Sequence, residues 1–590
     1  MQMLALCRRR TLCDPPAVMP KLSRYFETAR DASGAHRLVV KLTGVPLLRL
    51  AATNKGTAFT EKERVELGLD GLLPPHVSTL SEQVTRNYAA FTKEPTPLAK
   101  YQFLRALQER NETLFYALLG QHLAEMLPII YTPTVGDAVK QFHSIYQSAR
   151  GLSFSPLNIK RAKHVIDNCF YDDVRMIVAT DSSAILGIGD QGYGGLAIAI
   201  GKLALYTSGG GVSPWRSLPV GLDVGTDRDD LVQNPAYLGV RQSRLKGQEY
   251  LEFMDRFVDS VRVRYPRAIL QWEDLSKDAA FTVLERYRKK LPSFNDDIQG
   301  TGAVCLAGVL SACKHLDRPL RDQRVIVYGA GAGGGGVAWE IVRGMMASGL
   351  SEAQALERVF VLDSKGLLLA DRPMEDYKKP FAKTRASIAG WEIPGTPSLL
   401  DVIKKTKAQI LLGLSGQPGT FTEEIIVAMG DNADRPVIFA LSNPTSSCEA
   451  QPADILAWTE GRAIVATGSP FEPVVLGGKV HHIGQGNNAF IFPGLGFGAI
   501  LAQAREITDR MVMAAAMGLA DYTAEKHLAG GLIYPPVEEL REVAVHVAAR
   551  VIVQAFADGV AQSSKVAPEN AVSYVRSKMW QPHYLPFAKE

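Results

Sequence analysis

A glycine-rich turn between a strand-like and a helix-like segment most strongly constrains how this 590-residue chain can fold. The apolar run 324–328 leads into Gly-Ala-Gly-Ala-Gly-Gly-Gly-Gly, and a helix-like pattern follows over 336–347. Glycines allow a tight turn and let the backbone approach a pyrophosphate, which then meets the amides at the helix N-terminus. The pattern predicts a dinucleotide site, and the simpler alternative is a structural turn. The candidate cofactor-binding glycines are Gly329, Gly331, Gly334 and Gly336.

Strand-like and helix-like segments alternate on both sides of this turn. Before it, the pattern predicts strands at 175–180 and 218–224 and helices at 196–206 and 247–264. After it, further strands are predicted at 358–362, 409–412, 436–440 and 463–466. Strands that alternate with helices predict the α/β class with a mostly parallel, doubly wound sheet. Residues 60–150 instead repeat apolar side chains at helical spacing, which predicts a helical region.

Length and composition exclude several classes of protein. The chain exceeds the roughly 250–300 residues of a single core, so we expect several domains. A net charge of +4 without a helix dense in lysine or arginine argues against a nucleic acid partner. The longest weakly charged stretch, 487–504, contains glycines and falls short of the ~20 residues of a membrane span. Six cysteines without CxxC spacing exclude a zinc or disulfide framework and indicate a reducing compartment.

The first 20 residues differ in character from the rest of the chain. They contain Arg8, Arg9 and Arg10 and no acidic residue before Asp14. An arginine-rich, acid-poor leader is typical of mitochondrial presequences. We therefore expect residues 1–20 to be a targeting leader and the protein to reside in the mitochondrial matrix. The alternative is a short disordered basic tail on a cytoplasmic protein.

Two pairs of neighbouring acids stand at the ends of apolar segments. Glu273 and Asp274 close the run 268–272, and Asp296 with Asp297 precedes an apolar helix over 302–310. Carboxylate oxygens are the hard ligands that Mg²⁺ and Mn²⁺ prefer. The pattern favours Glu273, Asp274 and Asp297 as metal ligands over the alternative of solvated loops.

Two titratable residues lie in apolar surroundings. Tyr131 belongs to an apolar strand, 128–136, that a proline turn interrupts, and such a tyrosine is ordinarily structural. Lys202 belongs to an apolar helix, where a lysine either extends its ammonium to solvent or has a lowered pKa suited to proton abstraction. The asparagines Asn443, Asn487 and Asn488 follow strands, where asparagine is normally a turn former.

The region after the second predicted strand of the dinucleotide domain bears on the choice between NAD and NADP. Asp363 stands at the end of that strand, where an acid ordinarily binds the ribose 2′-hydroxyl of NAD and repels a 2′-phosphate. Ser364 and Lys365 follow directly, and Lys378 lies downstream. These residues supply cations that a 2′-phosphate needs; the alternative is a solvated basic loop.

These segments together resemble malic enzymes over nearly the whole chain. The resemblance lies in an ordered series of motifs that begin at the stated positions: TNKGTAFT at 53, GLLPP at 71, QERN at 108, YTPTVG at 131, IGDQG at 188, DVGT at 223, FNDDIQGT at 294, ALSNPT at 440, GSPF at 468 and GQGNN at 484. The series implies metal-dependent oxidative decarboxylation of L-malate to pyruvate and CO₂. Mg²⁺ or Mn²⁺ is the implied metal, and a homodimer or homotetramer is the implied assembly.

The resemblance also implies a role for each matching residue. Tyr131 matches the general acid, Lys202 the general base, and Asp296 lies beside them in the catalytic group. The implied metal ligands are Glu273, Asp274 and Asp297. The implied substrate contacts are Asn443 and Asn488, and Asn487 is the implied neighbour of the nicotinamide. Asn443 is also assigned to the cofactor site.

Family members that use NADP resemble this chain at Ser364 and Lys378, so the resemblance implies NADP, with NAD as the alternative. Malolactic enzyme is a second alternative, and a dinucleotide-binding regulator without activity is a third. The chain departs from the family pattern at Ala184, which replaces an arginine that helps to hold a malate carboxylate.

The resemblance further implies a dinucleotide-binding domain inserted in a second α/β domain, behind a helical N-terminal domain. The expected boundaries are a helical domain at 21–149, a central catalytic domain at 150–295 and 488–557, a Rossmann-like domain at 296–487, and a C-terminal segment at 558–590.

Overall fold

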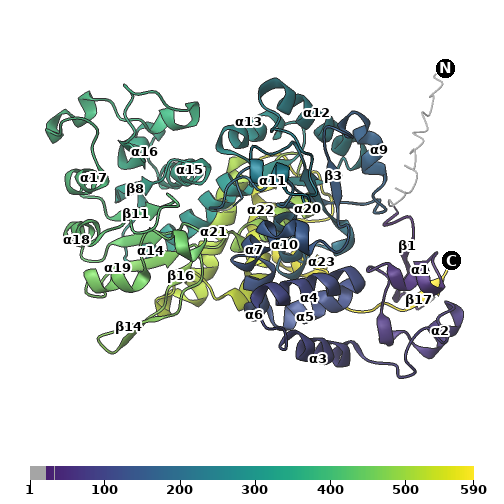
Figure 1. The fold of residues 1–590 in the computed structure, drawn as a ribbon. Coiled ribbons are helices and arrows are strands. Elements are labelled where there is room, and N and C mark those ends of the chain that lie inside the picture. Colours follow the sequence, from purple (N-terminus) through teal and green to yellow (C-terminus); the bar gives the residue numbers. More distant parts are fainter. Residues whose placement is uncertain (1–20, 32, 186) are drawn as a thin grey trace, which may run out of the picture.

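The computed structural model describes residues 21–31, 33–185 and 187–590 (Figure 1). The predicted leader, with Arg8, Arg9 and Arg10, lies outside the described residues. Helices dominate the N-terminal region after a small sheet. The main ones are α3 (Leu80–Phe91), α4 (Pro97–Arg110) and α5 (Glu112–Gln121). The small sheet pairs β1 (Phe26–Arg30) and β2 (His36–Val40) with β17 (Phe587–Lys589), so the last residues lie against the N-terminal region.

A five-stranded sheet forms the centre of the catalytic half. Its order is β3-β5-β4-β6-β7, and every neighbouring pair is parallel. The strands are β3 (Leu152–Phe154), β4 (Met176–Thr180), β5 (Ser217–Leu222), β6 (Ile269–Glu273) and β7 (Ser293–Asn295). Helices α10 (Leu196–Ser208) and α12 (Gly247–Arg264) match the predicted helices, with α12 at its predicted bounds. Parallel strands carry their carboxyl ends on one edge of a sheet, so the acids after β6 and β7 are brought together.

A seven-stranded sheet forms the second half, on the left in Figure 1. Its order is β10-β9-β8-β11-β12-β13-β16, and all neighbours are parallel except β10 with β9. The strands are β8 (Val325–Tyr328), β9 (Val359–Asp363), β10 (Gly366–Leu367), β11 (Ile410–Gly413), β12 (Val437–Ala440), β13 (Ile464–Thr467) and β16 (Gly484–Gln485). The predicted fold class is confirmed. Helix α15 (Ala332–Ala347) begins directly at the glycine-rich turn.

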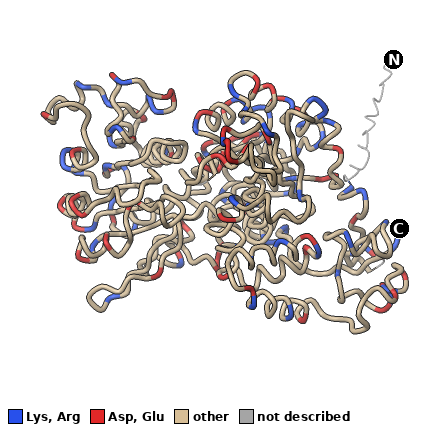
Figure 2. The backbone as a smooth tube through the Cα atoms, in the orientation of Figure 1, with Lys and Arg blue, Asp and Glu red and all other residues tan. Residues whose placement is uncertain are grey.

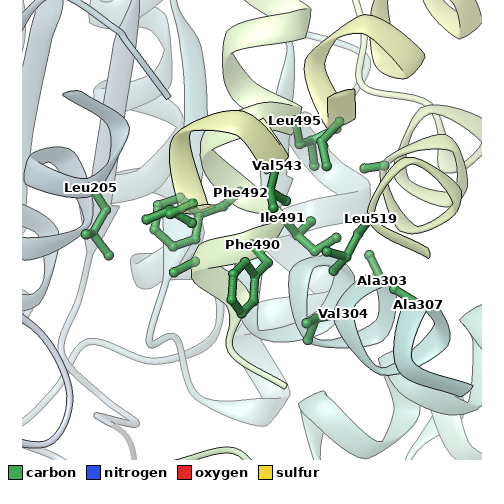
Figure 3. Close-up of a cluster of buried hydrophobic side chains, with 14 of the residues drawn as sticks. Leu205, Ala303, Val304, Ala307, Phe490, Ile491, Phe492, Leu495, Leu519 and Val543 are labelled. Atoms are coloured by element: carbon green, nitrogen blue, oxygen red, sulfur yellow. The ribbon is translucent and has the colours of Figure 1, made fainter. Parts of the chain in front are cut away.

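A shared apolar core joins the two halves (Figure 3). The chain returns from the seven-stranded sheet through Phe490 and Ile491 into α20 (Phe492–Ala502). Helices α14 (Thr301–His315), α21 (Asp509–Lys526) and α22 (Leu540–Ala557) pack around this segment. Since each of these elements lies in the same cluster of buried side chains, the two sheets are attached through a continuous core rather than through an exposed linker.

The segment around Tyr131 differs from its prediction. The apolar run forms helix α6 (Leu123–Ile130), and α7 (Thr134–Lys140) follows after a break at Pro133, so no strand forms there. A short apolar run is compatible with either a buried strand or a buried helix, and periodicity alone does not separate them. Tyr131 is thereby placed at the C-terminal end of α6.

Charged residues of both signs are interspersed along the backbone (Figure 2). Within the described ranges no single helix is long and apolar enough to cross a membrane, and the one pair that qualifies together, Glu112–Gln121 with Leu123–Lys140, is bent by 120°.

Helix α15 packs directly on the turn that carries the second acid pair. This turn is a single π-helical turn, η4 (Asp296–Gly300), and α14 continues from it. A Cβ atom at Gly336 would lie 2.1 Å from the carbonyl oxygen of Ile298. Gly336 therefore has no room for a side chain, and its absence of one lets the helix of the glycine-rich turn touch the acidic turn.

We expect Gly336→Ala to lower thermal stability, because the added methyl group must displace η4 or α15; overpacking of this kind costs about 1–3 kcal/mol. Gly333→Ala is the matched control, since a Cβ there would meet its nearest atom at 3.6 Å. Thermal unfolding of both variants checks the prediction. Equal melting temperatures for Gly336→Ala and wild type would contradict it.

Candidate active site

A cavity of about 590 Å³ opens between the two halves of the molecule. Its walls come from the carboxyl ends of strands in both sheets, from η4 and α14, and from the start of α15. The predicted site residues that it brings together are Tyr131, Ala184, Lys202, Glu273, Asp274, Asp297, Asn443, Asn487 and Asn488. Asp363, Ser364, Lys365 and Lys378 are not among its lining residues.

Three carboxylates converge on one side of this cavity. One oxygen from each of Glu273, Asp274 and Asp297 lies within 4.8 Å of the others. Glu273 ends β6, Asp274 follows with a positive φ of 53°, and its amide donates a hydrogen bond of 2.8 Å to Asp297 Oδ2. Gln271 Nε2 donates to Glu273 Oε2 at 2.7 Å. These contacts hold the three acids in one orientation at the edge of the sheet.

Burial changes the ionisation of this cluster. It raises the pKa of Glu273 well above the usual value, and it raises the pKa of Asp297 to about 6. Neighbouring acids add to both shifts. A divalent cation relieves such crowding, and an all-oxygen donor set of three carboxylates suits Mg²⁺ or Mn²⁺. The residues present therefore fit the predicted metal.

Lys202 lies between this cluster and a fourth acid. Its side chain is only 1% exposed, its Nζ is 2.9 Å from Glu273 Oε1, and it donates a hydrogen bond to Asp296 Oδ2. Burial by itself lowers the pKa of an ammonium, but Asp296 and Glu273 outweigh burial and hold the pKa of Lys202 well above its usual value. Both predicted alternatives are therefore wrong for the free protein: Lys202 neither reaches solvent nor has a lowered pKa.

The ring of Tyr131 faces the ammonium group of Lys202. Its ring centroid is 5.3 Å from Lys202 Nζ, and the residue is buried. Burial raises the pKa of the phenol, so the tyrosine retains its proton at neutral pH. Asn488 completes the group: its Nδ2 donates to Asp296 Oδ2 and to Thr301 Oγ1, each at 3.0 Å. A protonated acid and a lysine thus face one cavity, which is what proton transfer at two atoms of a small substrate requires.

The other two asparagines serve the local backbone as well as the cavity. Asn487 Oδ1 accepts a hydrogen bond of 2.8 Å from the amide of Ala489, while Asn443 accepts one from the hydroxyl of Ser469. Both asparagines still line the cavity. The turn-former prediction and the site prediction are therefore compatible.

The glycine-rich turn borders the cavity at the start of α15. A Cβ at Gly329 would lie 2.3 Å from the Leu414 carbonyl oxygen, and one at Gly334 would lie 1.6 Å from the Gly329 oxygen. Around Gly331 no atom lies within 4 Å of such a Cβ. No side chain caps the N-terminus of α15. Open space beside uncapped helix amides is the arrangement that a pyrophosphate requires.

Two of the cations near the end of β9, Arg372 and Lys378, are already paired with carboxylates. Asp363 Oδ1 accepts hydrogen bonds from the Lys365 amide at 2.9 Å and from Arg372 Nη2 at 2.8 Å. Lys378 Nζ lies 2.8 Å from Glu375 Oε2. Ser364 and the Lys365 side chain are exposed. Arg372 and Glu375 were missed from the sequence, although the three-residue spacing of Glu375 and Lys378 is a signal of helical ion pairing.

Comparison with known proteins decides the family. Residues 108–288 match the family described as "Malic enzyme, N-terminal domain" and residues 298–556 match "Malic enzyme, NAD binding domain". The chain is 44% identical over 556 residues to "NAD-dependent malic enzyme" of Pseudomonas savastanoi pv. phaseolicola, covering 94% of this chain and 98% of that protein. The chain belongs to the malic enzyme family. It is an oxidoreductase with an NAD-binding domain.

Further relatives and solved structures belong to the same family. "NAD-dependent malic enzyme 3" of Bacillus subtilis is 45% identical over 553 residues, covering 92% of this chain and 97% of that protein. Among solved structures, the Entamoeba histolytica malic enzyme has a TM-score of 0.54 at 23% identity, covering 87% of this chain and 90% of the other, which shows the shared fold. The Pyrococcus horikoshii malic enzyme has a TM-score of 0.51 at 26% identity, covering 77% and 89%. The curated relatives are named for NAD, so they do not support the NADP prediction.

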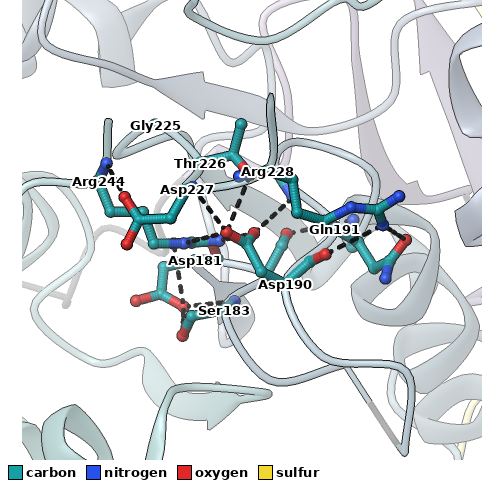
Figure 4. A network of polar contacts seen from close by, with 12 residues as sticks. Asp181, Ser183, Asp190, Gln191, Gly225, Thr226, Asp227, Arg228 and Arg244 are labelled. Carbon is teal, nitrogen blue, oxygen red and sulfur yellow. Dashed lines mark hydrogen bonds and ion pairs between the residues drawn. The ribbon is translucent and has the colours of Figure 1, made fainter. Parts of the chain in front are cut away.

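An ion pair between Asp190 and Arg244, both partly buried, lies beside the loop that carries Ala184 in this malic enzyme (Figure 4). Asp190 accepts two hydrogen bonds from Arg244, at 2.5 and 2.9 Å, and another of 2.9 Å from Thr226 Oγ1. Arg244 also donates to the Asp181 carbonyl at 3.0 Å. Within the described residues that line the cavity, no arginine replaces the family's carboxylate-binding arginine; the two cations there are Lys202 and Lys277.

The converging carboxylates predict metal binding by the purified protein. We expect Asp297→Asn to weaken Mn²⁺ binding by about 100-fold or more, since it removes one of three charged oxygen ligands. Asp278→Asn removes the same charge from an exposed position in the first turn of α13 (Lys277–Tyr287). This control should bind Mn²⁺ as the wild type does. Isothermal titration with Mn²⁺ measures both constants. Wild-type affinity in Asp297→Asn would exclude this residue as a ligand.

Proposed function

We propose that this malic enzyme catalyses the oxidative decarboxylation of L-malate to pyruvate and CO₂ with reduction of NAD. The observation that carries the proposal is the convergence of Lys202, Tyr131 and three carboxylates in one cavity that also borders the open N-terminus of α15. A proton-transferring pair, a metal-ligand set and a pyrophosphate site are thereby adjacent. The names of the relatives support the same reaction class.

Glu273, Asp274 and Asp297 would hold the divalent cation. When bound, Mg²⁺ or Mn²⁺ supplies Lewis-acid chemistry: it polarises the substrate's hydroxyl and carbonyl oxygens and stabilises the charge that develops as CO₂ departs. The second oxygen of Glu273 is fixed by Gln271, and Asp297 is fixed by the backbone of Asp274. The ligand set is therefore positioned by the protein itself.

Lys202 would remove the proton from the C2 hydroxyl of malate as hydride leaves for NAD. In the free protein its pKa is raised by Asp296 and Glu273, so it starts as an ammonium and must lose that proton before it acts as a base. Asp296 is positioned by Asn488 and keeps the lysine in place. Tyr131 keeps its own proton at neutral pH and can donate it to C3 after decarboxylation.

NAD as the cofactor is supported by Asp363 as well as by the relatives. A carboxylate at the end of β9 suits a ribose 2′-hydroxyl and repels a 2′-phosphate. The cation that motivated the NADP prediction, Lys378, is engaged by Glu375. The relatives are bacterial proteins, which supports the cytoplasmic alternative over the mitochondrial matrix. A homodimer or homotetramer, the domain boundaries and the individual site roles stay predictions.

An assay of the purified protein tests the reaction and the cofactor together. With malate and Mn²⁺, we expect pyruvate to form and NAD to be reduced with a higher kcat/KM than NADP. Activity should be lost in EDTA and return with Mn²⁺ or Mg²⁺. Formation of lactate would indicate malolactic activity instead, and full activity in metal-free buffer would contradict the metal assignment.

Substitution of the acid and the base should separate their roles. General acid–base groups contribute about 10²–10⁴-fold to a rate, so Lys202→Ala should lower kcat for malate oxidation by that order and be partly restored by small amines. Tyr131→Phe should slow enolpyruvate protonation more than reduction of oxaloacetate. Tyr146→Phe, a partly exposed tyrosine, is the matched control. Near wild-type kcat in both site variants would refute the assignment.

A further inference from the structure

One glutamate binds two lysines at the junction of the two halves of the enzyme. Glu375 Oε1 lies 2.9 Å from Lys277 Nζ, and Glu375 Oε2 lies 2.8 Å from Lys378 Nζ. Each carboxylate oxygen therefore has its own lysine. Lys277 begins helix α13 (Lys277–Tyr287) beside the five-stranded sheet, whereas Glu375 and Lys378 belong to the half with the seven-stranded sheet. The hydrogen bonds from Lys277 and Lys378 lower the pKa of Glu375 to about 2, so it is ionised at any working pH.

The segment with Glu375 and Lys378 is fastened to the glycine-rich turn. Glu375 directly precedes a 3₁₀ helix, η6 (Asp376–Phe381), which contains Lys378. In this helix Tyr377 donates a hydrogen bond of 2.9 Å to the Ala330 carbonyl. The Tyr377 ring stacks on Phe281 of α13 at 4.3 Å between centroids. The ion pair of Glu375 with Lys378 therefore lies close to the glycine-rich turn, the backbone that would receive the pyrophosphate.

Lys378 differs from its neighbour in how it is held. The Lys378 side chain is 10% exposed, whereas that of Lys379 is 64% exposed. A lysine that is largely buried and already paired with a carboxylate turns toward a new anion only if it gives up that ion pair. Arg372, the cation next to Asp363, is likewise paired with that aspartate.

We propose that Glu375 is a specificity-determining residue that disfavours NADP, by pairing with the buried Lys378 so that this lysine is not available to a 2′-phosphate. A 2′-phosphate carries close to two negative charges and needs unpaired cations to balance the repulsion of Asp363. The inference rests on the proposed use of NAD. It gives a reason why a lysine at the position typical of NADP users does not produce NADP preference in this chain.

Substitution of Glu375 tests the proposal against a purely structural role. A bridge between the two halves predicts that Glu375→Gln changes NAD and NADP use by the same factor, so their ratio stays constant. Release of Lys378 predicts that the ratio of kcat/KM for NADP to that for NAD rises about tenfold, the effect of one charge-assisted contact. The ratio separates these two roles because it cancels any general loss of activity.

Two further variants sharpen the test. Asp376→Asn removes the same charge one residue away, from a side chain that is 93% exposed and paired with Lys379 at 2.5 Å, and should leave the ratio unchanged. The double variant Glu375→Gln/Lys378→Gln should lose the gain, since Lys378 is the cation that Glu375→Gln releases. Calorimetric binding of adenosine 2′,5′-bisphosphate and of 5′-AMP should show the same order without turnover.

The possible results separate the inference from the proposed function. Higher kcat/KM with NADP than with NAD in the wild type would overturn the NAD assignment itself. If the wild type prefers NAD but Glu375→Gln leaves both the ratio and the binding of the bisphosphate unchanged, only the role of Glu375 is overturned. An equal rise in Asp376→Asn, or a gain that persists in the double variant, would also overturn it.

Discussion

The buried ion pairs of Lys202 are the interaction on which the active site depends. Four carboxylates lie at the carboxyl ends of the adjacent strands β6 and β7, and Lys202 binds two of them, Glu273 and Asp296. Charges are costly to bury unless they are paired and hydrogen-bonded. The lysine offsets part of that cost, and its position fixes α10 against the strand ends. Lys202 and the expected metal ligands are therefore built as one unit, in which the position of each group depends on the others.

A second constraint is the contact of backbone with backbone at Gly336. Because this glycine touches the Ile298 carbonyl, helix α15 and the turn η4 cannot move independently. Helix α14 also packs closely on α15 at Gly302, where a Cβ would lie 2.9 Å from the Gly336 oxygen. Densely packed groups have little room to move relative to one another. The expected pyrophosphate site at the start of α15 and the acids of η4 are thus held close to a constant separation, which suits the proposed hydride transfer beside a metal.

Charge at the cofactor site depends on pairing more than on composition. Lys378 and Arg372 are two cations near the end of β9, and both are bound to carboxylates of the same chain. Their attraction for a further anion is correspondingly reduced, since a bound anion must displace an existing partner. A lysine at position 378 is therefore compatible with relatives that are named for NAD, because Lys378 is paired with Glu375.

The sequence by itself determined the features that depend on neighbouring residues. The alternating strands and helices, the glycine-rich turn, the helix α12 and the acid pairs at strand ends are all local patterns, and the structure has them at or within a few residues of the expected positions. The resemblance to malic enzymes was equally readable, because it rests on short motifs in a fixed order. The segment around Tyr131 was not determined in this way, since a short apolar run suits a buried strand and a buried helix alike.

Only the tertiary structure decided the charge state and availability of individual side chains. Lys202 meets Asp296 across 94 residues of sequence, and Lys277 meets Glu375 across 98. Burial lowers the pKa of a lysine and nearby carboxylates raise it, so the direction of the shift depends on distances that no local pattern encodes. The same holds for the cations near Asp363. Their number is set by the sequence, but whether each is free depends on which distant carboxylate the fold brings within hydrogen-bonding distance.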